Sequence, residues 1–174
     1  MRGPFQNEPG TDFSIPANRE AMKAALKEVE AQLGQRYPLV IGGKRIETDA
    51  VITSRNPGNL DQVVGEVSKA SAEHVEQAIQ AAWDAFREWR SMSAEGRASV
   101  AFKLAALLRR HRLELAAWMV YELDKAWDEA DGEVAEAIDM MEWNGRQALE
   151  LDQPVKLATL PNEATTYHYL PLGV

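Results

Sequence analysis

The sequence predicts an α/β fold that is rich in helix, carries short strands and ends in a β-hairpin. Apolar residues recur at helical spacing through the middle of the chain, short apolar runs precede them, and two further runs close the sequence. The chain has 174 residues, 45% of them hydrophobic, which is enough for one domain with a core. We divide it into an irregular arm over residues 1–16, a main body over 17–150 and a hairpin over 151–174.

The first predicted helix follows the arm. Asn18 is placed to cap its N-terminus, and Gly34 suits the position that follows a helix C-terminus. Between them, spacings of 4, 3 and 4 residues, which mark one face of a helix, separate four apolar side chains: Met22, Leu26, Val29 and Leu33.

Short strands are predicted after this helix, in four apolar runs: 39–41, 44–46, 51–53 and 63–67. The pair Gly42-Gly43 between the first two runs is typical of a tight β-hairpin. The cluster Asn56-Pro57-Gly58 after the third run indicates a second turn.

Four helices are predicted for the middle of the chain. Ser71 and Ser93 can cap the first two, each with an acidic residue in the first turn. The third helix, over 113–123, is nearly all apolar on two sides and should be buried, and the fourth spans about 127–149. The first of these helices carries an apolar stripe: Val75, Ile79, Ala82, Phe86 and Trp89. All five tryptophans fall on predicted helices, where core or interface packing is expected.

In the C-terminal part of the chain the apolar residues no longer recur at helical spacing. Residues 154–157 and 165–170 read as two strands, and residues 160–163 between them are turn material. An isolated hairpin leaves unpaired edges, so we expect it to bind a second copy of the chain or the remaining part of a longer protein.

Composition excludes several functions. The formal net charge is −8, which argues against a nucleic-acid or anionic-membrane partner. No apolar run approaches the roughly 20 residues that span a bilayer, and residues 1–14 contain no apolar signal core. A cytoplasmic location is therefore expected.

The residues suggest no self-contained catalytic site. The chain has no cysteine, which rules out disulfides, cysteine-based zinc sites and a thiol nucleophile on this chain. His74, His111 and His168 fall on three separate elements, and we assign none of them to a metal. The basic cluster at 109–112 ends a helix in an acidic protein, so helix capping and surface ion pairing are favoured over nucleic-acid binding. The acidic start of the last helix is read as a solvated first turn rather than a metal site.

Several stretches together resemble the aldehyde dehydrogenase superfamily. They are Leu39–Lys44 with Asn56–Gly58, Val63–Ser68, Glu95–Ala98 and the final Pro171–Val174. Within that superfamily the 1-pyrroline-5-carboxylate dehydrogenase subfamily is the most similar, through Glu8–Phe13, Val29–Gly34, Tyr37–Ile41 and Glu136–Asp139. The resemblance covers nearly the whole chain.

The resemblance implies a function for the full-length enzyme. In this family a Cys attacks an aldehyde, a hydride passes to NAD, and a Glu activates water; these residues lie beyond the point that matches Val174. Residues 17–150 would be the N-terminal part of the NAD-binding domain, and 151–174 the start of the oligomerisation hairpin. We expect a truncated enzyme, inactive alone and without tight NAD binding, whose parent oxidises L-glutamate γ-semialdehyde to L-glutamate in proline catabolism. The alternative is a stand-alone interaction module that reuses this fold.

Two site residues follow from the resemblance, and neither is catalytic. Glu142 matches a substrate-binding helix Glu, where a carboxylate suits an ammonium group; an ordinary surface Glu is the alternative. Glu122 matches an acidic ligand of a structural monovalent metal cation, with a plain surface Glu as the alternative. Two stretches depart from the family: Asp124-Lys125-Ala126 replaces Gly-Lys-Pro, and Trp143-Asn144-Gly145 replaces two aromatics and an Ala, although Gly within a helix costs up to about 1 kcal/mol relative to Ala.

Overall fold

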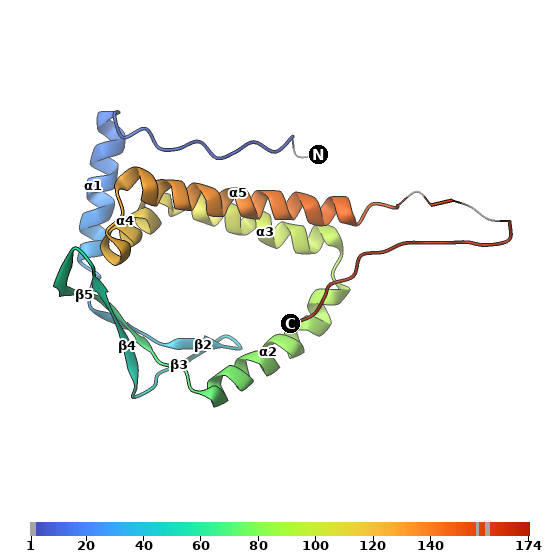
Figure 1. Ribbon diagram of the computed structural model, residues 1–174, viewed down its shortest axis with the longest axis horizontal. Helices are drawn as coiled ribbons and strands as arrows, with labels where there is room; N and C mark the ends of the chain where they lie inside the picture. Colours follow the sequence, from blue (N-terminus) through green and yellow to red (C-terminus); the bar gives the residue numbers. More distant parts are fainter. Residues whose placement is uncertain (1–2, 156, 159–160) are drawn as a thin grey trace.

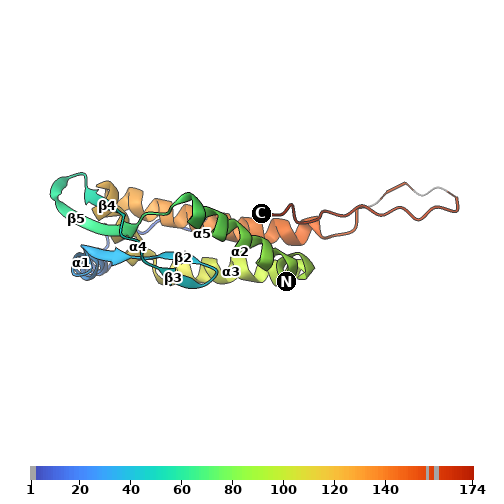
Figure 2. The same ribbon diagram turned by 90° about the horizontal axis from the view of Figure 1, so that it is seen from below.

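The computed structural model describes residues 3–155, 157–158 and 161–174. Two long helices, α3 and α5, lie side by side, α1 crosses them at one end with α4, and the strands connect α1 to α2 (Figures 1 and 2). In chain order the elements are α1 (Pro16–Glu30), β1 (Gln35–Tyr37), β2 (Leu39–Ile41), β3 (Lys44–Ile46), β4 (Val51–Asn56), β5 (Asn59–Ser68), α2 (Ala72–Ser91), α3 (Ala94–Arg110), α4 (Arg112–Leu123) and α5 (Trp127–Leu151). The predicted mixture of helices and short strands is confirmed.

Helix α1 begins earlier than predicted. Ile15 is its N-cap and Pro16 its first residue, a position where the missing proline N–H leaves no helical hydrogen bond unmade. Asn18 is therefore not the cap; its side-chain amide donates to the carbonyl oxygen of Asp12 at 2.9 Å. Gly34 does take the left-handed conformation expected of it, with φ of 78°.

The hairpin predicted at Gly42-Gly43 forms, and the turn predicted at Asn56-Pro57-Gly58 joins two further paired strands. Gly42 and Gly43 join antiparallel strands β2 and β3 with φ of 55° and 77°, which residues with a Cβ rarely adopt. Strands β4 and β5 pair antiparallel, and β1 pairs parallel to β5, giving the order β1-β5-β4. Strand β1 was not predicted, because Gln35-Arg36-Tyr37 has no apolar alternation; all three residues are exposed.

Both predicted serine caps are confirmed. The Ser71 hydroxyl accepts from the backbone N–H of His74, and the His74 ring in turn bonds the Ser71 N–H, so histidine takes the usual Glu position of a capping box. The Ser93 hydroxyl accepts from the N–H of Gly96 at 3.1 Å.

Replacing Ser71 with alanine is expected to destabilise α2 by about 1 kcal/mol, because the N–H of His74 in its first turn loses its acceptor, the Ser71 hydroxyl. Amide exchange measured along α2 should speed up while exchange in α5 stays unchanged. Ser91→Ala is the matched control, since this serine ends the same helix and only donates to the carbonyl of Glu88. Equal effects of the two changes would contradict a capping role.

The core lies where α1, α3, α4 and α5 meet. Five of its nine buried members are alanines, which allow the helices to approach closely. The cluster comprises Met22, Ala25, Val29, Ala105, Ala116, Ala117, Ala130, Val134 and Ile138.

The apolar stripe of α2 is largely exposed. No residue of α2 is buried, and Val75, Ile79 and Trp89 are 50%, 42% and 39% exposed. Trp83 and Trp143 are exposed as well, whereas Trp118 and Trp127 pack partly against the core. The helical period is correct, but the described part of the chain leaves most of this face exposed.

The predicted C-terminal strands are not seen in the described residues. After Leu151 the described residues contain no strand, and residues 156, 159 and 160 of the expected hairpin lie outside them. The segment runs out from α5 and returns toward α2 (Figure 1). Residues 151–155 and 165–169 of this segment lie beside each other, and their described residues form no strand pairing. This is expected of two strands that have no third strand or packed face to stabilise them. Among the described helices, none is both long and apolar enough to cross a bilayer.

Candidate functional site

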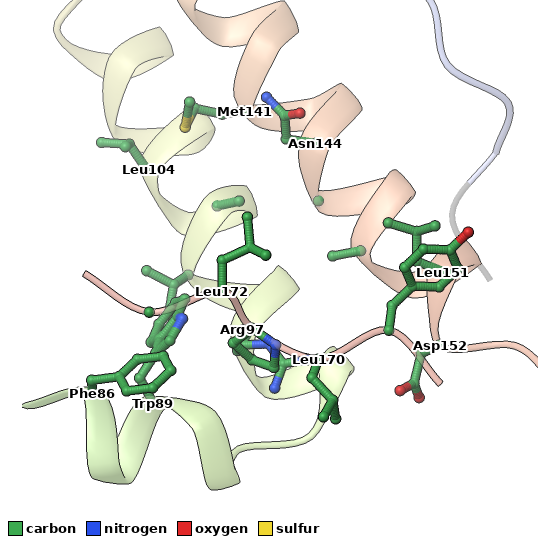
Figure 3. A pocket seen from close by; sticks show the side chains of 17 residues that line it. Phe86, Trp89, Arg97, Leu104, Met141, Asn144, Leu151, Asp152, Leu170 and Leu172 are labelled. Atoms are coloured by element: carbon green, nitrogen blue, oxygen red, sulfur yellow. The ribbon is translucent and has the colours of Figure 1, made fainter. Parts of the chain in front are cut away.

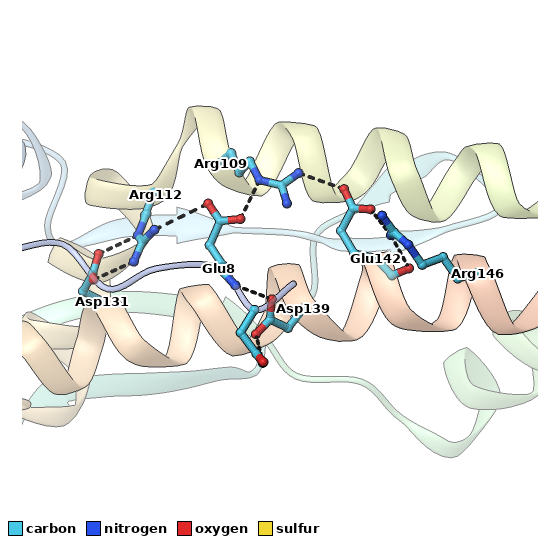
Figure 4. A network of polar contacts seen from close by, with 8 residues as sticks. Glu8, Arg109, Arg112, Asp131, Asp139, Glu142 and Arg146 are labelled. Carbon is cyan, nitrogen blue, oxygen red and sulfur yellow. Dashed lines mark hydrogen bonds and ion pairs between the residues drawn. The ribbon is translucent and has the colours of Figure 1, made fainter. Parts of the chain in front are cut away.

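A network of charged side chains joins the N-terminal arm to three helices (Figure 4). Arg109 lies in the last turn of α3, and Arg112 is the first residue of α4. Helix α5 carries Asp131 and Glu142 on one face. Because these two positions are 11 residues apart, about three helical turns, both carboxylates point toward α3 and α4. Glu8 of the arm lies between the two arginines.

The Arg112–Asp131 pair is the most buried part of the network. Arg112 donates from Nε and Nη2 to the two Asp131 oxygens at 2.6 and 2.7 Å. Thr11 adds its backbone N–H and its hydroxyl, at 2.7 and 2.8 Å. Burial alone would raise the pKa of Asp131, which is 1% exposed, but the bonds from Arg112 and Thr11 outweigh it and lower that pKa. Asp131 is therefore ionised at neutral pH.

Glu8 bridges the two arginines. Its carboxylate accepts from Arg109 Nε at 2.8 Å and lies 3.6 Å from Arg112 Nη1. Its backbone N–H donates to Asp139 at 2.7 Å, and the Asn7 amide donates to the other Asp139 oxygen at 2.8 Å. Negative and positive side chains thus alternate from Glu142 through Arg109, Glu8 and Arg112 to Asp131.

Glu142 is not an ordinary surface residue. It is 7% exposed, and its two carboxylate oxygens accept from Arg109 at 2.9 Å and Arg146 at 2.5 Å. Burial acts to raise its pKa, but the two arginines outweigh this effect and lower it. A substrate ammonium group would have to replace one of these guanidinium groups, so the substrate-binding role stays a prediction.

Glu122 lies in different surroundings. It is exposed on α4, where the Ser54 hydroxyl donates to it at 3.3 Å, and it lines a surface pocket of about 430 Å³ with Tyr37, Glu114 and Trp118. The described residues bring together no group of three or more His, Cys, Asp or Glu side chains that could hold a metal ion. The monovalent-cation role of Glu122 stays a prediction.

A further hollow is lined by neither glutamate. It is an apolar groove of about 560 Å³ between α2, α3, α5 and the returning C-terminal segment (Figure 3). Phe86 and Trp89 of α2 face Leu104 of α3 and Met141 of α5 across it. Arg97 and Asp152 are the charged side chains of its lining, so the groove lacks the convergent polar groups of a catalytic pocket.

Comparison with known proteins decides the family. The aldehyde dehydrogenase family model matches residues 45–174, three quarters of the chain. The chain belongs to this family. The 1-pyrroline-5-carboxylate dehydrogenases of Geobacillus kaustophilus and Geobacillus thermodenitrificans are 50% and 48% identical to it over all 174 residues, which correspond to 34% of each relative. The chain therefore spans about a third of the length of the curated relatives it matches.

Solved structures of this aldehyde dehydrogenase family share the fold. The 1-pyrroline-5-carboxylate dehydrogenase from Thermus with bound NAD superposes with a TM-score of 0.95 and 41% identity, covering 99% of this chain and 34% of that one. The enzyme from Mycobacterium tuberculosis bound with NAD gives 0.80 and 25%, covering 91% of this chain and 30% of that one. The predicted superfamily and subfamily resemblances are thereby confirmed. The curated relatives match residues 1–44 as well, which lie outside the family model and contain Glu8, Thr11 and α1.

Most contacts of the charge network were not predicted from the sequence. The basic cluster at 109–112 was expected to form ion pairs at the surface; it forms ion pairs, but Arg112 is 13% exposed and its partner is buried. The arginines at the end of a predicted helix were the signal from which ion pairs could be predicted. Glu8 is 101 residues from Arg109 in sequence, and no local pattern could have paired them.

Proposed function

We propose that this chain forms the N-terminal third of a 1-pyrroline-5-carboxylate dehydrogenase. The complete enzyme would oxidise L-glutamate γ-semialdehyde to L-glutamate with NAD. The observation that carries the proposal is the match to enzymes of this name over the whole chain, at 48–50% identity but over only 34% of their length.

The exposed apolar surface of α2 and α3 supports the proposal. Along with the α2 stripe, Val100, Leu104 and Leu107 of α3 are 46%, 43% and 47% exposed. Contiguous exposed apolar side chains of this size mark an interface. The remaining two thirds of the dehydrogenase would cover this surface, whereas a stand-alone module would be expected to have closed its core.

The chain alone would be inactive. Covalent aldehyde oxidation needs an activated thiolate, and the sequence has no cysteine. The residues of the apolar groove also do not fit NAD, because a pyrophosphate needs several directed donors and the described lining offers one guanidinium group, that of Arg97. The NAD site and the nucleophile would come from the part of the enzyme that this chain does not span.

Complementation tests the proposal. The purified 174-residue chain, given semialdehyde and NAD, is expected to produce no NADH, measured by absorbance. Co-expressed with the remaining two thirds of the Geobacillus kaustophilus relative, it is expected to co-purify with that fragment and restore NADH formation. The fragment expressed alone is the control. NADH formation by the chain alone, or no association with the fragment, would contradict the proposal.

A further inference from the structure

The first part of the N-terminal arm is held to the helices mainly by charge. Residues 3–11 form no helix or strand and run alongside α5 (Figure 1). The polar contacts described above attach them to Asp131 and Asp139 of α5 and, through Glu8, to Arg109 and Arg112. Phe5 adds a ring contact with Trp143 at 5.3 Å, although Trp143 stays 49% exposed.

The helices keep their ion pairs without this segment. Arg109 also binds Glu142, and Arg112 also binds Asp131 through two hydrogen bonds. Asp139 is half-buried, so water can replace the arm at its carboxylate. Lifting residues 3–11 therefore leaves no buried charge without a partner, which is the condition that makes loss of a buried group costly.

The chain is anchored immediately after this segment. The ring of Phe13 packs against the core cluster and meets Trp127 edge-on at 5.7 Å. The Asp12 side chain accepts from the N–H of Ser14 at 2.8 Å, which fixes a turn at this point. Motion of the arm would therefore stop at residue 12, and α1 would stay in place.

We propose that residues 3–11 form a releasable strap over the Arg109–Glu142 pair, locked by the carboxylate of Glu8. When the strap lifts, Arg109 loses one of its two carboxylate partners. Neither the strap nor its release depends on the proposed dehydrogenase function. The relevant property is that the strap opens as a unit while the helices remain folded.

Two backbone amides report the state of the strap directly. The N–H groups of Glu8 and Thr11 each donate to a carboxylate of α5, so both are protected from hydrogen exchange only while the strap is closed. In Glu8→Gln, loss of the charge-assisted bonds should speed exchange at both amides by about tenfold or more. Exchange at Ile138 in the centre of α5 should not change. Glu20→Gln, which removes an exposed carboxylate paired with Lys23, is the control and should alter neither amide.

A second variant tests whether the strap moves as one body. Asp139→Ala removes the acceptor of the Glu8 amide and leaves Asp131, the acceptor of Thr11, in place. The proposal requires faster exchange at Thr11 in this variant too. Unchanged exchange at Thr11 in either variant, or equally faster exchange at Ile138, would show that the arm is not a releasable strap.

Discussion

Replacing Arg112 with methionine is expected to destabilise the protein by about 3–5 kcal/mol, because the change leaves a buried carboxylate without its charged partner. Asp131 would keep the two donors of Thr11 but lose both guanidinium hydrogen bonds. The free energy of unfolding of a domain is about 5–15 kcal/mol, so this change would remove a large part of it. Urea unfolding monitored by circular dichroism measures the loss. Arg110→Met is the matched control: this neighbouring side chain is exposed, and we expect a change within about 0.5 kcal/mol.

The pH dependence of the stability lost in Arg112→Met distinguishes the effect of the lost charge from that of the lost packing. The pKa of Asp131 is lowered in the native chain, so its contribution to stability is complete above the unfolded value of about 3.9 and is lost as pH falls through the folded one. In Arg112→Met the burial remains without the arginine, and the folded pKa of Asp131 should lie above its unfolded value. The variant then regains stability as pH falls toward 4, so the difference from the native chain should shrink. A difference that is the same at pH 7 and pH 4 would show that lost packing, rather than charge, is responsible.

Local signals in the sequence predicted most helices and turns. Ser71 and Ser93 cap helices because a side-chain hydroxyl acts on N–H groups two or three residues away. The last two helices were placed to within two residues of their ends. Even the departure from Gly at position 124 has a local explanation: Asp124 ends α4 in the left-handed conformation, with φ of 54°, which Asp tolerates better than most residues.

Partners distant in sequence could not be predicted. Asp131 follows two exposed acidic residues on α5 and was given no structural role from the sequence, yet it is buried because Arg112 and Thr11 meet it there. The apolar stripe of α2 was predicted with the right period, but periodicity identifies an apolar face and not what covers it. The strand-like runs after residue 151 are a related case, because such runs pair only where another strand or a packed face stabilises them.

Gly145 is constrained by the packing of α5 against α3, which the sequence alone does not show. It lies buried inside α5, where the family resemblance suggests Ala and where Gly lowers helix stability. A Cβ at this position would lie 2.7 and 2.8 Å from Cε1 and Cζ of Phe102 on α3. Phe102 is 8% exposed, and the guanidinium of Arg146 lies over its ring at 5.8 Å, so the ring has little freedom to move away.

Gly145→Ala is therefore expected to destabilise the protein by about 1–2 kcal/mol: overpacking costs about 1–3 kcal/mol, and the gain in helix propensity offsets about 0.5–1 kcal/mol of that. Gly132→Ala in the same helix is the matched control, because this residue is exposed and a Cβ there would meet nothing within 4 Å. It should stabilise the protein by about 0.5–1 kcal/mol, so the two changes should have opposite signs in urea unfolding. Adding Phe102→Leu to Gly145→Ala should remove part of the penalty, since a smaller side chain leaves room for the new methyl group. Stabilisation by both glycine changes would mean that α3 and α5 adjust freely and that Phe102 does not determine their separation.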